Sequence, residues 1–120
     1  MCAETDAEAE RLASSADMAF ALLQTGRLIP VPPVEEAVRF LAEERARPTF
    51  FSRPRRRIVG SPATVRAGIE AAARDYAADE MMVVTITYDH AARRRSYELI
   101  AEEFGILAQS SASAAFASSQ

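Results

Sequence analysis

The feature that most constrains the fold is the apolar run MMVVTIT at residues 81–87. It is rich in β-branched residues and lacks the polar and apolar alternation of a half-exposed strand, which favours a strand covered on both faces in a parallel sheet. Such a strand needs hydrogen-bonded neighbours on both sides. The only other extended-looking stretch, RRIV at 56–59, is too short and too basic to be its partner. The sequence therefore predicts one parallel-type strand and a chain that looks incomplete.

Four segments show the apolar periodicity of amphipathic helices, at about residues 6–25, 33–44, 62–77 and 90–104. Gly26 provides a stop for the first helix, while Ser61 and Asp89 are suited to cap the third and fourth. On the first helix the predicted inner face places Met18 outside and comprises Ala9, Leu12, Ala13, Ala16, Ala19, Phe20 and Leu23. The second half of the chain thus reads helix, strand, helix, the order typical of α/β proteins.

Length and composition fit one modest soluble domain of 120 residues, which we expect to comprise residues 1–105 followed by a disordered low-complexity tail at 106–120. The net charge of −3 argues against a nucleic-acid binder by bulk charge. Cys2 is the single cysteine, so no intramolecular disulfide can form. No segment is apolar enough for a membrane span, and the acidic N-terminus is unlike a secretory signal. We therefore expect a cytoplasmic protein without a membrane partner.

The arginine-rich segment RPTFFSRPRRR at residues 47–57 allows two interpretations. Its arginines could follow phosphates while Phe50 and Phe51 stack on bases, as in single-strand binders; these arginines are Arg53, Arg55, Arg56 and Arg57. Alternatively, the segment is a solvated linker whose aromatic rings pack on a neighbouring layer. We favour the linker because the rest of the chain is acidic.

Two longer stretches resemble a known family. They are ERLASSADMAFALLQTGRLIPVPPVEEA and RIVGSPATVRAGIEAAARDYAADEMMVVTITYDHAARRRSYELIAEEFG. Together they resemble the C-terminal end of luciferase-like, flavin-dependent monooxygenases, which are (β/α)8 barrels. In that family a VGSP turn opens the helix before the last strand, and an acid-histidine junction precedes the closing helix. The resemblance covers roughly residues 10–105, and residues 42–57 depart from it most.

The resemblance implies an α/β fold: the C-terminal fragment of a (β/α)8 TIM barrel, with the seven earlier strands absent. It also implies reduced flavin mononucleotide (FMN) as cofactor, with O2 and a small organic substrate as co-reactants. In the family, earlier strands hold most of the flavin. We therefore expect this chain alone to bind no FMN and to be inactive, and to need the missing N-terminal barrel segment or a second copy.

Residues just beyond the C-terminal end of a barrel strand face the active-site mouth, which points to Thr87, Tyr88, Asp89 and His90. His90 is the only histidine, and the adjacent Asp89 could raise its basicity, so these two are the candidate catalytic residues. The structural alternative is that Asp89 caps the helix and His90 merely follows it. One histidine and one acid fall short of a metal-ligand set, so no metal site is predicted.

Three hypotheses remain. The first is the C-terminal part of a flavin-dependent oxidoreductase, inactive by itself. The second is a small non-catalytic α/β interaction module that needs a partner or a dimer. The third is an arginine-mediated nucleic-acid binder, which we regard as the weakest.

Overall fold

The structure of the chain is a computed structural model that describes residues 1–46 and 57–106. The prediction of a disordered tail falls almost entirely on residues 107–120, which lie outside the described residues. The same holds for Arg53, Arg55 and Arg56 and for both phenylalanines of the arginine-rich segment. Arg57 is the one member of that arginine group within the described range.

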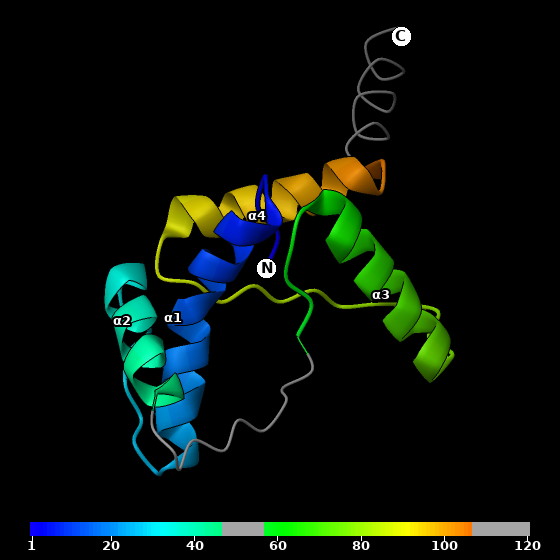
Figure 1. The fold of residues 1–120 in the computed structure, drawn as a ribbon. Coiled ribbons are helices and arrows are strands. Elements are labelled where there is room, and N and C mark those ends of the chain that lie inside the picture. Colours follow the sequence, from blue (N-terminus) through cyan, green and yellow to red (C-terminus); the bar gives the residue numbers. More distant parts are fainter. Residues whose placement is uncertain (47–56, 107–120) are drawn as a thin grey trace, which may run out of the picture.

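Four helices account for most of the described residues (Figure 1). They are α1 (Asp6–Gln24), α2 (Val34–Arg45), α3 (Pro62–Tyr76) and α4 (His90–Glu103). Each begins and ends within one residue of the range that the sequence predicts. Helix α1 packs against α2, and α3 packs against α4. None of the helices in the described part of the chain is both long and apolar enough to cross a membrane.

Local chemistry explains where the helices begin. The Thr5 hydroxyl accepts a hydrogen bond from the Glu8 amide, which satisfies one of the unpaired N–H groups at the start of α1. Pro33 precedes α2, and two acidic residues follow in its first turn, where the helix dipole favours negative charge. Pro62 occupies the first position of α3, where its missing N–H costs nothing.

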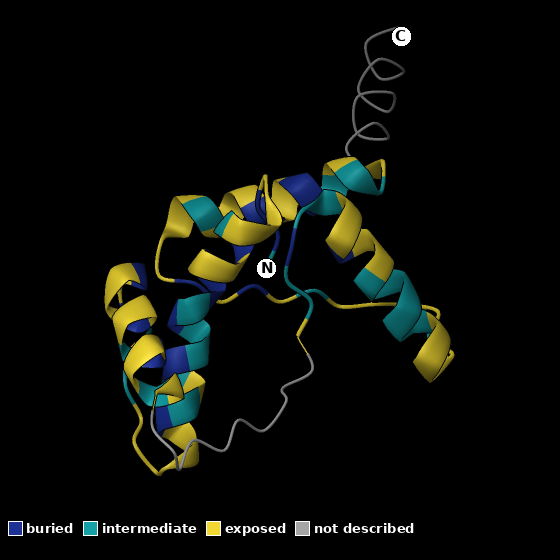
Figure 2. Ribbon diagram, in the orientation of Figure 1, coloured by how far each residue is buried: buried dark blue, intermediate teal, exposed yellow. Residues whose placement is uncertain are grey.

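The buried apolar side chains form three small clusters and not one large core (Figure 2). The first cluster, between the N-terminus, α3 and α4, comprises Cys2, Val65, Leu99 and Ile100. The second, beneath the start of α1, comprises Ala3, Ala9, Leu12 and Val34. The third, between α1 and α2, comprises Met18, Leu22 and Ala37. With so few members in each cluster, the loss of one buried contact affects a large share of the local packing.

The predicted inner face of α1 was partly wrong. Met18 is buried against α2, together with Leu22, although the sequence placed Met18 outside. Phe20 and Leu23, which were predicted inside, are exposed. The reason is that α2 covers the predicted Ala9 and Leu12 near the start of α1 but Met18 and Leu22 farther along it. Helix periodicity alone does not say which residues a neighbouring helix will cover.

The predicted strand at 81–87 is wrong for the described residues. The chain there runs from α3 to α4 without helical turns, and no described residue pairs with its backbone as a sheet neighbour. The one bridge in the described ranges is an isolated parallel bridge between Cys2 and Gly60. A strand requires a hydrogen-bonded ladder, which an apolar pattern alone cannot supply.

The predicted fold class, an α/β fragment of a (β/α)8 barrel, is therefore wrong as well. The described residues form a small helical fold that contains no sheet. The interpretation failed because it inferred a parallel sheet from one apolar run, whereas the four helices and their pairings require no sheet to pack on.

Ala77 ends α3 in a left-handed conformation, with φ of 50°. That conformation costs a non-glycine residue about 1 kcal/mol, and glycine adopts it without the penalty. We expect Ala77→Gly to raise the free energy of unfolding by about 0.5–1 kcal/mol. The control Ala67→Gly makes the same change at an ordinary exposed position inside α3 and should lower it by about 1 kcal/mol. Urea unfolding followed by circular dichroism measures both, and equal losses in the two variants would contradict the conformational argument.

Candidate functional site

The extended segment 81–88 is held to the helices through its odd-numbered residues. The Thr85 N–H donates to the Tyr97 hydroxyl of α4 at 2.9 Å. The Thr87 hydroxyl donates to the Leu12 carbonyl of α1, also at 2.9 Å. Both threonines are buried, and Thr85 is only 3% exposed. The segment is therefore fixed to two different helices by hydroxyl and amide groups on one side.

A fully buried hydroxyl on α4 ties this segment to the N-terminus. The Ser96 Oγ accepts a hydrogen bond from the Cys2 N–H at 2.9 Å and lies 3.2 Å from the Thr85 Oγ1. Ser96 and Cys2 are both almost completely excluded from solvent. A buried N–H group without an acceptor costs free energy. The Ser96 hydroxyl avoids this cost for the Cys2 N–H, which has no other acceptor among the described residues. Burial also raises the pKa of the Cys2 thiol, which favours the unreactive protonated form.

The N-terminal residues lie beside residues 58–60 as a short parallel pairing. The Gly60 N–H donates to the Met1 carbonyl at 3.1 Å, and the Ala3 N–H donates to the Gly60 carbonyl at 3.2 Å. The Met1 ammonium donates to the Ile58 carbonyl at 2.9 Å, and its partial burial lowers the pKa of this amino group. A side chain at Gly60 would collide with Thr64, which lies 2.5 Å from the position of an added Cβ. The pairing therefore depends on glycine at position 60.

Asp6 connects the start of α1 to the start of α3. Its carboxylate accepts a hydrogen bond from the Ser61 N–H at 2.6 Å. This backbone hydrogen bond, aided by the hydroxyls of Thr64 and Ser61, lowers the pKa of Asp6 below its ordinary value of 3.8. One carboxylate thus satisfies an amide at the beginning of a second helix, and it helps to hold residues 58–60 next to the N-terminus.

The even-numbered residues of the segment from Met82 to Tyr88 are apolar and exposed. Met82 is 92% exposed and Val84 is 67% exposed, and Ile86 and Tyr88 are also exposed. An ordinary half-exposed strand turns its polar residues to water and its apolar residues to the protein. Here the order is inverted, because the hydroxyls point inward and the hydrocarbon side chains point outward. We call this outward set, Met82, Val84, Ile86 and Tyr88, the apolar edge.

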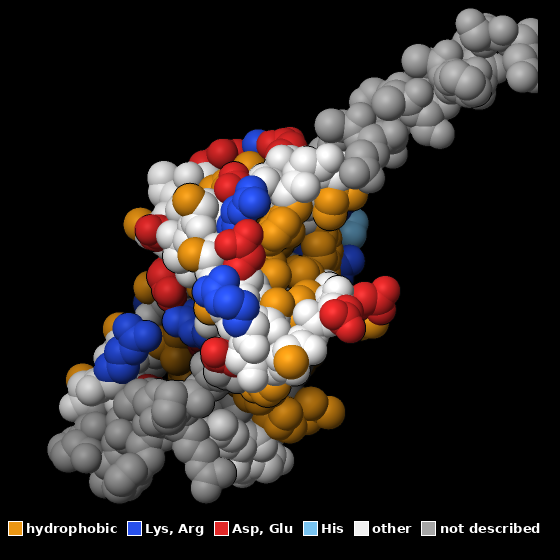
Figure 3. Space-filling view, turned by 90° about the vertical axis from the view of Figure 1, so that its right-hand side faces the viewer, with side chains coloured by type: hydrophobic (Ala, Val, Ile, Leu, Met, Phe, Trp, Pro, Cys, Tyr) orange, Lys and Arg blue, Asp and Glu red, His pale blue; other side chains and the backbone are white. Residues whose placement is uncertain are grey.

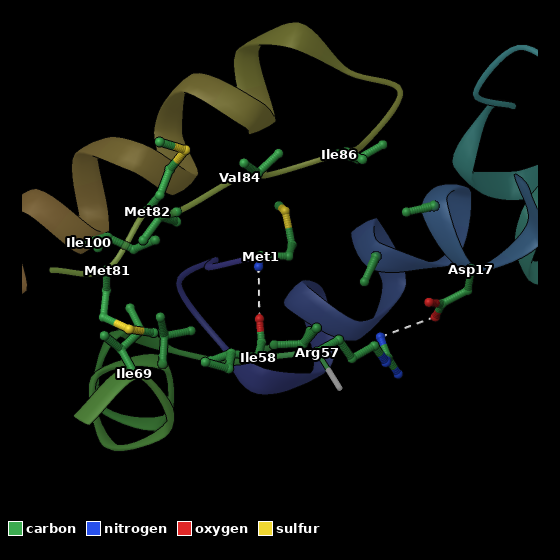
Figure 4. A pocket seen from close by; sticks show the side chains of 15 residues that line it. Met1, Asp17, Arg57, Ile58, Ile69, Met81, Met82, Val84, Ile86 and Ile100 are labelled. Carbon is green, nitrogen blue, oxygen red and sulfur yellow. Dashed lines mark hydrogen bonds and ion pairs between the residues drawn. The ribbon is translucent and has the colours of Figure 1, made fainter. Parts of the chain in front are cut away.

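Beside the apolar edge lies a hollow of about 340 Å³ (Figure 4). Its wall is formed by the N-terminus, α1, residues 57–59, α3, α4 and the extended segment, including Met82, Val84 and Ile86 of the apolar edge. The labelled apolar residues in Figure 4 include Met1, Ile58, Ile69, Met81 and Ile100. On the face shown in Figure 3, hydrophobic side chains gather between groups of charged ones. The hollow offers room and apolar contacts, and its wall also carries the charged side chains of Arg57 and Asp17.

Arg57 is the cation in the wall of this hollow, and two carboxylates neutralise it. Its guanidinium lies 2.7 Å from the Glu10 carboxylate and 3.1 Å from that of Asp17 (Figure 4). A phosphate would have to displace these partners, so Arg57 does not support the nucleic-acid hypothesis. The other arginines of that hypothesis lie outside the described residues, and nucleic-acid binding through them stays a prediction.

The predicted catalytic pair lies at the start of α4. Asp89 is the N-cap of the helix, and its carboxylate accepts a hydrogen bond from the Ala91 N–H at 3.1 Å. His90 is the first helical residue and is exposed. Of the two preceding candidates, Thr87 is buried against α1 and Tyr88 belongs to the apolar edge. The capping contact is the structural role considered for Asp89, and a catalytic role for Asp89 and His90 stays a prediction.

Several residues of this site were not predicted from the sequence. None of Ser96, Tyr97 and Asp6 stood out in the sequence as a residue that would bind a distant backbone amide. The sequence did carry one usable signal: Thr85 and Thr87 are two residues apart, so both lie on one side of an extended chain. Within the described residues there is no group of three or more side chains placed to hold a metal ion.

Known proteins resemble this chain over most of its length, although no family model matches it. It is 34% identical over 104 residues to the uncharacterized protein YceB of Bacillus subtilis (strain 168), a match that covers 87% of this chain and 31% of YceB. The uncharacterized protein YwcH of the same organism is 36% identical over 109 residues, covering 87% and 32%. The crystal structure of apo-MsnO8 superposes with a TM-score of 0.72 at 34% identity, covering 87% of this chain and 32% of MsnO8. The chain therefore spans about a third of the length of the proteins it matches.

These findings correct the resemblance stated from the sequence. Membership of the luciferase-like flavin-dependent monooxygenases is not supported, because no family model matches, the matching Bacillus proteins are uncharacterized and the described fold is helical without a sheet. The prediction of that family, with its barrel, was therefore wrong. Flavin-dependent oxidation by an intact protein is not tested by these findings and stays a prediction. The expectation of FMN depended on this resemblance, and no contact of the described residues adds support to it.

Replacement of Ser96 by alanine tests the buried hydroxyl. It leaves the Cys2 N–H without its described acceptor, so we expect the free energy of unfolding to fall by about 1–3 kcal/mol. The matched control is Ser14→Ala, because the exposed Ser14 hydroxyl bonds only to the Glu10 carbonyl of its own helix. That variant should change stability by less than about 0.5 kcal/mol. Chemical unfolding measures the free energy of unfolding of both variants. If Ser96→Ala lowers it no more than Ser14→Ala does, the Ser96 hydroxyl does not have this stabilising role.

Titration of Asp6 should contribute to acid sensitivity. Because the folded state lowers its pKa below 3.8, the ionised carboxylate favours the fold, and this contribution is complete above about pH 5. It is lost as the pH falls below 3.8 and through the folded pKa. Asp6→Asn keeps an acceptor for the Ser61 N–H but removes the charge, so its stability should fall less steeply below pH 5 than that of the natural chain. Unfolding curves at several pH values test this, with Asp79→Asn as the exposed control; equal slopes for Asp6→Asn and the natural chain would refute it.

Proposed function

We propose that this chain is a helical interaction module that a further polypeptide completes by covering the apolar edge and the adjoining hollow. The observation that carries the proposal is the inverted polarity of segment 81–88. Its inner side comprises the buried Thr85 and Thr87 together with the partly buried Val83, and its exposed side consists of Met82, Val84, Ile86 and Tyr88. A contiguous exposed apolar surface of this kind marks a site of association in soluble proteins.

The energetics favour an occupied edge. Full burial of one aliphatic side chain of this size contributes about 1.5–3 kcal/mol, so covering the apolar edge is worth several such contributions. The isolated chain obtains none of it for the well-exposed Met82 and Val84. The adjoining hollow provides space for apolar side chains from outside the chain, and the one arginine in its wall, Arg57, is already paired with Glu10 and Asp17.

The length of the matching proteins supports a particular occupant. YceB, YwcH and MsnO8 each contain about twice as much further polypeptide as the part that this chain matches. The matched region of MsnO8 superposes on 87% of this chain with a TM-score of 0.72. We therefore take the occupant to be polypeptide corresponding to the unmatched part of these proteins, whether on the same chain or on a separate one. A second copy of this chain is the competing occupant.

Co-expression tests this proposal. The natural chain, carrying an affinity tag, is produced together with the part of MsnO8 that lies outside the match. We expect the two polypeptides to purify as a complex. Met82→Asp combined with Val84→Asp should abolish it, because each aspartate would have to be buried without a partner. Leu28→Asp is the matched control, since Leu28 is 85% exposed and lies outside the segment.

Three results would count against the proposal. The natural chain could fail to retain the MsnO8 polypeptide, or the double variant could retain it as well as the control does. Sedimentation of the chain alone could also reveal a dimer that the same double variant disrupts, and this would assign the edge to a second copy. Circular dichroism of the isolated variants checks that their helices are intact.

A further inference from the structure

From the backbone of segment 81–88 we infer that the partner binds as an added strand, which pairs with the backbone of residues 82, 84 and 86. This inference rests on the proposed function and specifies the kind of partner surface that the site recognises. The apolar edge could be covered by a helix, by a loop or by an extended strand. These partners differ in whether they can form hydrogen bonds with the backbone of segment 81–88.

Most backbone groups of the segment have no protein partner. Among the described residues, no backbone–backbone hydrogen bond involves residues 81–88. The Thr85 N–H has a side-chain partner, since it donates to the Tyr97 hydroxyl. A buried backbone N–H or C=O group without a partner costs free energy comparable to a lost hydrogen bond. Any partner that covers the apolar edge must therefore also satisfy these groups.

The two edges of the segment are not equivalent. In an extended chain, the N–H and C=O of successive residues point to opposite edges. The Thr85 N–H points to the edge beside Tyr97, so the N–H groups of Val84 and Ile86 point to the other edge. No described residue bonds to the backbone of Met82, Val84 or Ile86. This second edge is open for a ladder, and seven residues from 82 to 88 extend over about 20 Å, an ordinary strand length.

A partner must cover the apolar side chains and also supply hydrogen-bond partners for the backbone of the segment. A strand does both, whereas a helix does only the first. A helix would cover the side chains of the apolar edge, but its own backbone bonds are internal, so the N–H groups of Val84 and Ile86 would lose water without gaining a partner. An extended partner supplies backbone hydrogen bonds and places alternate side chains over the exposed residues. Alternation on the partner would match the period of two already present in segment 82–88.

Amide hydrogen exchange on the complex with the MsnO8 polypeptide tests the inference at single residues. We expect exchange at Val84 and Ile86 to slow by about tenfold or more on complex formation, because these amides gain partners. Exchange at Thr85, whose N–H is already bonded to Tyr97, should change far less. If Val84 and Ile86 gain no more protection than Leu28, the partner is not an added strand, even though the complex itself supports the proposed function.

A backbone substitution provides an independent test. Val84→Pro removes the N–H that the inference requires, and Val84→Ala removes most of the same side chain but keeps the N–H. We expect the proline variant to bind the MsnO8 polypeptide about tenfold more weakly than the alanine variant. Circular dichroism and unfolding of the two isolated variants should agree, because no described group accepts the Val84 N–H. Equal binding of the two variants would overturn the inference, whereas failure of the natural chain to bind would instead overturn the proposed function.

Discussion

The Ser96 hydroxyl is the interaction on which the arrangement of this chain depends. It lies on α4, accepts the Cys2 amide and contacts the Thr85 hydroxyl, so one buried oxygen connects the C-terminal helix, the N-terminus and the extended segment. Ser96 lies 94 residues from Cys2 and 11 residues from Thr85 in the sequence. Because Cys2 in turn lies beside Gly60, the position of Ser96 also fixes where α3 begins.

The inward position of Thr85 determines what faces outward. The Thr85 hydroxyl lies beside Ser96, and the Thr85 amide is bonded to Tyr97. These two contacts fix how the segment is turned about its long axis, so the neighbouring Val84 and Ile86 project to the side opposite to the Thr85 side chain. The exposed hydrocarbon on 82–88 therefore follows from a polar anchor on the other side. A shift of one residue would bury the valine and isoleucine but would leave the hydroxyls without their partners and would break the contact with Leu12.

The sequence predicted what short-range chemistry controls and failed where distant contacts decide. Capping by Asp89, the stop at Gly26 and the apolar period were enough to place all four helices within one residue. The same periodicity could not show that α2 covers Met18 and leaves Phe20 exposed. It also could not show that residues 81–87 lack a ladder in the described chain, because a ladder depends on a second segment and not on the run itself.

The candidate site was hidden for a related reason. Read as one string, MMVVTIT shows no alternation, because its outward residues are apolar and its inward residues include both valine and threonine. Alternation becomes visible only when Thr85 and Thr87 are found bonded to Ser96 and Leu12. The three buried clusters all lie on the helix side of the segment or between helices, and none includes Met82, Val84 or Ile86. The described chain thus satisfies its buried hydroxyls internally and leaves its most exposed hydrocarbon for contact with another polypeptide.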